Sequence, residues 1–123
     1  MTVNYQIRDE AVWSDGTPIS GDDLQFTLDI IMDPDLPVTR TVYEDIISTE
    51  VGPKTFTYTL SAPTALYELI FGNIIPKHAV EGSDFTTDWN ETMWPSAGPF
   101  VFDSWQKGEF VKLVRNDNYW KVD

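Results

Sequence analysis

The stretch that decides the fold is Trp13-Ser14-Asp15-Gly16-Thr17-Pro18-Ile19-Ser20-Gly21-Asp22-Asp23-Leu24. Asp15-Gly16 is a strong turn dipeptide, because Asp hydrogen-bonds its own backbone and Gly adopts a positive φ without steric cost. Pro18 has no N–H and cannot continue a hydrogen-bonded ladder. Ser20 stands where an N-cap belongs, and Asp23 follows it at the spacing of a capping box. The stretch therefore predicts a turn followed at once by a helix.

The residues after this turn have the pattern of an amphipathic helix over residues 20–33. Leu24, Leu28 and Ile31 recur at the spacing that places them on one helical face. Asp22 and Asp23 put negative charge at the positive end of the helix dipole. Pro34 ends the helix because proline removes a backbone donor.

Two antiparallel hairpins are predicted further along the chain. In the first, residues 45–51 and 55–61 flank Gly52-Pro53-Lys54, and the second arm alternates between large apolar residues and Thr or Ser. In the second, residues 100–105 and 109–115 flank Gln106-Lys107-Gly108. Gly108 stands where a three-residue loop needs the left-handed conformation.

Shorter elements complete an α+β fold of antiparallel hairpins with two or three helices, in a single domain over residues 1–123. Residues 5–8 and 11–13 are predicted as short strands, residues 41–45 and 77–80 as helical turns, and residues 82–97 as a loop. Residues 63–71 are predicted as a short helix, with Leu66, Leu69 and Ile70 facing inward.

Composition excludes several classes of function. The chain has 123 residues, 41% of them hydrophobic, which is typical of a folded core rather than of disorder. Its net charge of −12 repels nucleic acid phosphates. No run approaches the length of a membrane-spanning helix. Cysteine is absent, which removes disulfides, thiol catalysis and thiolate metal sites.

Catalytic and metal-binding patterns are weak, so we expect neither an enzyme nor a cofactor. His78 is the single histidine, and no G-x-S-x-G motif accompanies it. Asp33, Asp35 and Glu44 match three positions of a calcium-binding loop, but Val38 replaces the glycine that its sharp turn needs. No metal site is therefore predicted.

Three ordered motifs resemble a known family. The opening stretch resembles W-S-D-G-x-P-x-[ST]-A-x-D-[VL], with Gly21 in place of the usual Ala. Residues 97–109 resemble G-[TS]-G-P-[YF]-x-[LF]-x-x-[WY]-x-x-G-[ED], although Ser96-Ala97 replaces the usual Gly-Thr. Residues 113–120 resemble L-x-R-N-x-x-Y-W. Together they are similar to the solute-binding proteins of peptide, dipeptide and nickel ABC importers, known as family 5, over roughly residues 5–121.

This resemblance implies a function in transport. The chain would be an excised portion of lobe I of a larger protein with the two-lobed, type II fold of periplasmic binding proteins. The intact protein would bind peptides or oligopeptides outside the cell and deliver them to a membrane permease. An export signal, often that of a lipoprotein, would lie upstream and supply the membrane anchor. The motif residues assigned a structural role are Trp13, Asp15, Gly16, Pro18, Asp23, Gly98, Pro99, Trp105, Gly108, Arg115, Asn116, Tyr119 and Trp120.

The resemblance also indicates candidate residues for contact with the solute. Arg40 and Tyr43 keep the spacing of an R-x-x-W segment that faces the cleft in nickel-chelate-binding relatives, although a salt bridge for Arg40 and a core role for Tyr43 are the alternative. Those relatives also tend to have an Arg just before the I-x-P segment, where this chain has Phe71-Gly72-Asn73.

The tryptophan content is also compatible with a second function. Trp89 and Trp94 lie in a polar loop outside the motifs, so they are further candidates for a ligand cleft. Because indole rings stack on sugars, the alternative function is a carbohydrate-binding module or a glycosidase accessory domain.

Overall fold

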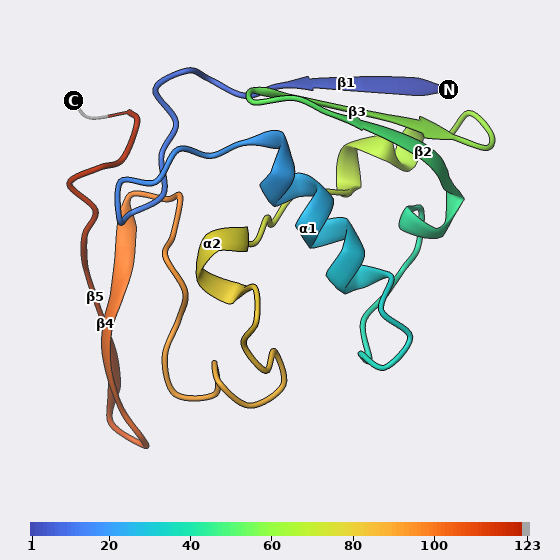
Figure 1. Cartoon of the computed structure of the whole chain (residues 1–123). Helices are drawn as coiled ribbons and strands as arrows, with labels where there is room; N and C mark the ends of the chain where they lie inside the picture. Colours follow the sequence, from blue (N-terminus) through green and yellow to red (C-terminus); the bar gives the residue numbers. More distant parts are fainter. Residues whose placement is uncertain (122–123) are drawn as a thin grey trace. The chain divides into compact units, whose positions relative to one another are not determined.

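The computed structural model describes residues 1–121, which form two compact units. Unit 1 consists of Met1–Arg8 and Ser20–Lys77, and unit 2 consists of Asp9–Ile19 and the chain from His78 onward. The elements are helices and antiparallel strands (Figure 1), which confirms the predicted α+β class.

Unit 1 is built on a three-stranded antiparallel sheet. Its strands are β1 (Thr2–Gln6), β2 (Ile46–Val51) and β3 (Thr55–Leu60), in the order β1-β3-β2. The turn between β2 and β3 is closed by a 2.9 Å hydrogen bond from Gly52 N to Thr55 O, which confirms the first hairpin. β1 begins three residues before the strand predicted at residues 5–8, because it pairs with β3 from Thr2 onward.

Helix α1 (Gly21–Ile31) lies along one face of this sheet (Figure 1). Its N-cap, Ser20, is extended, and the Ser20 N–H donates to Asp23 Oδ2 at 3.1 Å. This bond is the half of a capping box in which the third helical residue reaches back to the N-cap. The helix closes at Met32, two residues before Pro34, so the predicted helix is confirmed with slightly narrower bounds.

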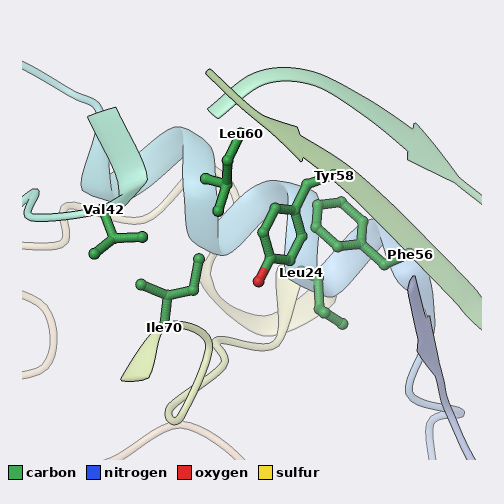
Figure 2. Close-up of a cluster of buried hydrophobic side chains, with 6 residues drawn as sticks. All are labelled: Leu24, Val42, Phe56, Tyr58, Leu60 and Ile70. Atoms are coloured by element: carbon green, nitrogen blue, oxygen red, sulfur yellow. The ribbon is translucent and has the colours of Figure 1, made fainter. Parts of the chain in front are cut away.

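The core of unit 1 lies between α1 and β3. Figure 2 shows the buried side chains of Leu24, Val42, Phe56, Tyr58, Leu60 and Ile70 converging there. The three members from β3 are at most 1% exposed, as the alternating pattern predicts. Burying a side chain of this size contributes about 1.5–3 kcal/mol. This cluster therefore stabilises the packing of α1 against the sheet.

The short helices depart from the predicted pattern of burial. They are η1 (Tyr43–Asp45), η2 (Ala65–Leu69) and α2 (Lys77–Val80). The prediction that Leu66 and Leu69 face inward is wrong, because they are 47% and 73% exposed, whereas Ile70 is buried. The η2 segment is a 3₁₀-helix, whose three residues per turn place Leu66 and Leu69 on the same outward side.

Unit 2 contains the second hairpin, formed by β4 (Phe100–Gln106) and β5 (Phe110–Arg115). The loop lies at residues 107–109, one residue later than predicted, and Gly108 has the positive φ, +80°, that the loop requires. The strand predicted at residues 11–13 is wrong: Val12 forms an isolated bridge to Pro18 that closes the turn between them. Within residues 1–121, no helix combines the length and the apolar character needed to cross a membrane.

Candidate functional site

The three sequence motifs meet in one hydrogen-bonded junction inside unit 2. Ser14 N donates to Ser96 O at 2.7 Å, and Ser96 N donates back to Ser14 Oγ at 3.0 Å. Asn116 Nδ2 donates to Gly98 O at 2.8 Å, and Asn118 Nδ2 donates to Ser14 O, also at 2.8 Å. Asn116 is only 3% exposed, so its amide replaces water as the partner of Gly98. These hydrogen bonds join the three motif segments and so stabilise unit 2.

The turn at the first motif is fixed by a carboxylate. Asp15 Oδ1 accepts from Thr17 N at 3.0 Å, and Asp15 Oδ2 lies 2.6 Å from His78 Nε2. Gly16 has a φ of +89°, as the turn dipeptide predicts. Burial raises the pKa of Asp15, but the hydrogen bonds from His78 and Thr17 outweigh it, so the pKa lies below its ordinary value.

The motif tryptophans differ in their surroundings. Trp13 is 2% exposed, as expected for a residue that packs the fold, and Trp120 is half-buried with its ring 5.7 Å from that of Tyr119. Trp105 is 42% exposed, with Lys107 Nζ 5.4 Å from its ring centroid. The expectation that Trp105 packs the fold is therefore not met within these residues.

Arg40 is tied to the loop that follows α1. Its Nη2 donates to the carbonyl oxygens of Asp33 and Leu36, the latter at 2.9 Å, and its Nη1 donates to Val38 O at 3.5 Å. These bonds involve three of the five N–H groups of a guanidinium. Arg40 is half-buried as a whole, and both of its Nη atoms donate to backbone carbonyls of this loop.

Tyr43 joins two segments of unit 1 that are 28 residues apart. Its hydroxyl oxygen accepts a 2.7 Å hydrogen bond from Phe71 N, and the two rings meet edge to face at 5.2 Å. Burial raises the pKa of the Tyr43 hydroxyl above its ordinary value, and the bond from Phe71 N offsets part of this rise. Tyr43 thus has a structural contact at its polar end.

The backbone on both sides of this contact is strained. Val42 has φ +72° and Phe71 has φ +56°, and both are residues that rarely adopt a positive φ. Such positions cost about 1–3 kcal/mol each and are concentrated at functional sites. Phe71 contacts Tyr43, and the two residues that follow it, Gly72 and Asn73, are both exposed. The sequence does not predict this loop, because position 71 is Phe rather than the Gly or Asn that would indicate a left-handed residue.

Trp89 and Trp94 belong to unit 2 and pack in an aromatic cluster with Phe85. The rings of Phe85 and Trp94 stack at 5.7 Å, and Trp89 meets Trp94 edge to face at 5.5 Å. Trp89 Nε1 donates to Ser83 Oγ at 3.0 Å. Intramolecular packing therefore uses one face of the Trp94 ring and the polar atom of Trp89.

The whole chain, residues 1–123, matches the family described as bacterial extracellular solute-binding proteins, family 5 Middle. The chain belongs to family 5. A binding protein of Brucella melitensis is 31% identical over 98% of this chain. The periplasmic oligopeptide-binding protein OppA of Salmonella typhimurium is 30% identical over 94% of it. This family 5 chain spans about a fifth to a quarter of the length of these relatives, 20% of the first and 25% of the second.

Solved structures of family 5 relatives share the fold. The periplasmic EDTA-binding protein EppA is 31% identical, with a TM-score of 0.86 over 97% of this chain and 24% of its own. NikZ of Campylobacter jejuni, solved in complex with Ni(L-His), is 27% identical, with a TM-score of 0.88 over 99% of this chain and 25% of its own. Both of these relatives are binding proteins.

Proposed function

We propose that this chain is part of lobe I of a two-lobed protein that captures peptides or oligopeptides outside the cell and passes them to a membrane permease. The observation that carries the proposal is the family match over the whole chain, together with a named oligopeptide-binding relative that is 30% identical. Two lobes that close on a solute by a hinge are a common device in such proteins.

The segment from Arg40 to Tyr43, with the loop at Phe71–Asn73, is the solute-contacting edge that we assign to unit 1. Its support is the strained backbone at Val42 and Phe71 and the half-buried position of Arg40, which is not enclosed in the core. A guanidinium presents a rigid fork that suits a carboxylate, such as a peptide C-terminus or an acidic side chain.

A peptide fits this edge better than a nickel chelate does. The chain has Phe71-Gly72-Asn73 where nickel-chelate-binding relatives tend to have an Arg. Among residues 1–121, no group of three or more His, Asp or Glu residues is arranged to hold a metal ion. The carbohydrate alternative has less support, because Trp94 stacks on Phe85.

No reaction is part of this proposal. The described contacts of His78 are those of a turn-stabilising residue, since its Nε2 pairs with Asp15. The protein would act outside the cell or in the periplasm, held to the membrane by a lipoprotein anchor upstream of this chain. Its partners would be the solute and the permease.

The test is to identify the solute directly. The full-length protein is purified from its native host without refolding, and co-purified small molecules are released and identified by mass spectrometry. Peptides are the expected result, and their affinity is then measured by calorimetry. Recovery of oligosaccharides or of a metal chelate with no peptide would contradict the proposal.

A further inference from the structure

The loop between α2 and β4 in unit 2 (Figure 1) contains the tripeptide Asn90-Glu91-Thr92. It has the form Asn-x-Thr with a residue other than proline at x, which is the acceptor sequence for N-linked glycosylation and is typical of surface loops in exported proteins. The chain has five asparagines, and the residues two positions after the other four are Gln6, Ile75, Asn118 and Trp120. Asn90 is therefore the single asparagine of this sequence that meets the requirement.

The acceptor tripeptide lies at the surface of unit 2. Asn90, Glu91 and Thr92 are all exposed. Trp89, directly before them, is half-buried and donates its Nε1–H to Ser83 Oγ at 3.0 Å. The loop is thus fastened by its tryptophan, while the next three side chains face solvent, where there is room for a bulky substituent.

The side-chain amide of Asn90 takes no part in holding the described fold together. The Asn90 backbone N–H donates to Thr87 O at 3.3 Å, but none of the hydrogen bonds described for residues 1–121 uses the Asn90 side chain. By contrast, other parts of the chain are bonded to the side-chain amides of Asn4, Asn116 and Asn118. A substituent on Asn90 Nδ2 would therefore break no described contact.

The residues after Asn90 can also leave the fold at small cost. A transferase requires this, because it holds the acceptor chain in its own active site. Residues 91–93 lie outside the helices and strands, and no backbone hydrogen bond described within residues 1–121 involves them. Glu91 pairs with Lys107, but these side chains are 71% and 64% exposed, and such pairs contribute about 0–1 kcal/mol. Local opening of a segment with so few contacts costs little free energy.

An exposed carboxylate supplies a second recognition element. Asp88 stands two positions before Asn90, and its Oδ2 accepts from Asp84 N at 2.8 Å. Because Asp88 is exposed, its charge is accessible to an arginine or lysine of an enzyme, and a charge-assisted hydrogen bond is about twice as strong as a neutral one. The acceptor sequence is therefore extended to Asp-x-Asn-x-Thr.

We propose that Asn90 is the attachment site of an N-linked oligosaccharide, transferred outside the cytoplasm from a lipid-linked pyrophosphoryl oligosaccharide by a membrane-bound transferase. Asn90 Nδ2 attacks the anomeric carbon, a C–N bond forms, and the bond from that carbon to the pyrophosphate oxygen breaks. The lipid pyrophosphate leaves with the bonding electrons, and the amide proton passes to a basic group of the transferase. The proposal uses the extracellular location of family 5 and is independent of the solute.

Mass spectrometry of the full-length protein from its native host tests this site. Trypsin releases Asn90 in the peptide of residues 78–107 and Asn73 in the peptide of residues 55–77. We expect the first peptide to carry the added mass of several sugars, and fragmentation that preserves side-chain modifications to locate them on Asn90. Asn73 is the matched control, because it is also exposed but is followed two positions later by Ile75. Wholly unmodified Asn90 would overturn the proposal, as would sugar on Asn73.

Substitutions separate an N-linked glycan from other modifications. Asn90→Gln and Thr92→Ala should each abolish the added mass, whereas Thr92→Ser should retain it, because serine keeps the hydroxyl that the acceptor sequence requires. Asp88→Asn keeps an oxygen for Asp84 N but removes the charge, so the modified fraction should fall several-fold. Sugar that persists in Asn90→Gln would be attached to a serine or threonine and would contradict the proposal. None of these readouts depends on solute binding, so the proposed function can fail while this inference holds.

Discussion

The side chain of Asp23 holds the backbone of Lys77, 54 residues further along the chain. Asp23 Oδ1 accepts from Lys77 N at 2.9 Å, while Oδ2 accepts from Ser20 N at 3.1 Å. Asp23 is 4% exposed. One turn later on α1, Thr27 Oγ1 accepts from Ile75 N at 2.8 Å. The N-terminal half of α1 therefore fixes the segment that leads into α2.

Replacing this carboxylate should cost much more stability than an ordinary surface substitution. Asp23→Ala leaves the N–H groups of Ser20 and Lys77 without their buried acceptor, so we expect a loss of about 2–4 kcal/mol in the free energy of unfolding. Urea denaturation of the 123-residue chain measures it. The neighbouring Asp22→Ala is the control, because Asp22 is exposed and contributes less than about 1 kcal/mol through the helix dipole. Equal losses in the two variants would show that Asp23 also acts only through the dipole.

The surroundings of Gly21 predict that alanine at this position lowers stability, although the family pattern has Ala there. A Cβ at this position would lie 2.5 Å from Gly52 O and would also press on Thr55 O, because Gly21 N bonds to Gly52 O at 3.1 Å. Gly21→Ala should therefore destabilise by about 1–3 kcal/mol, although Ala is usual at this point of the family motif. The control is Gly72→Ala, which meets nothing within 4 Å and should change stability by less than about 1 kcal/mol. Thermal melting of both variants measures this difference. An unchanged melting temperature for Gly21→Ala would show that the β2–β3 turn moves away to make room for the Cβ.

Local signals explain the parts of the fold that sequence predicted well. The start of α1 follows from the cap formed by Ser20 and Asp23, and the buried face of β3 follows from strict alternation. Non-local contacts explain the errors. β1 takes its bounds from pairing with β3, 49 to 57 residues away. The exposure of Leu66 and Leu69 follows from a 3₁₀ geometry that the apolar pattern does not reveal.

The site was predictable only in part, for the same reason. The motif spacing identified Asn116 and Gly98 as structural residues, and they are joined by a hydrogen bond across 18 positions. The contact between Tyr43 and Phe71 could not be predicted, because a positive φ at Phe71 or Val42 is imposed by the surrounding packing and opposes the intrinsic preference of the residue.

Stability should depend on pH through Asp15. The lowered pKa of Asp15 means that the ionised carboxylate favours the folded state above the ordinary value of 3.8, and that this contribution is lost as the pH falls through the folded pKa below it. We expect Asp15→Asn to lower the melting temperature by a few degrees at pH 6, a small effect because the side chain is 40% exposed. The curves of variant and wild type should converge as the pH falls below 3.8.

Two comparisons make the pH experiment decisive. Asp117→Asn is the matched control, because Asp117 is 89% exposed and lies 3.6 Å from Arg115, so little change is expected at any pH. A gap between Asp15→Asn and wild type that stays constant from pH 6 to acid would contradict the role of the Asp15 charge. It would instead show that the amide disturbs the turn.

Arg40 offers the sharpest test of the solute-contacting edge. In the full-length protein, Arg40→Gln removes the charge, and we expect the affinity for a peptide with a free C-terminal carboxylate to fall at least tenfold, about 1.4 kcal/mol. The same variant loses bonds to the carbonyls of Asp33, which is exposed, and Leu36, which is half-buried, so the free energy of unfolding should fall by about 1 kcal/mol. Calorimetry with a peptide and with its C-terminal amide separates the two effects, since only the acid should lose affinity.

Arg115→Gln is the control, because the Arg115 side chain is 70% exposed in unit 2, and this variant should change neither affinity nor stability. If affinity holds while stability falls, Arg40 serves only to fasten the loop after α1, and the solute is bound elsewhere.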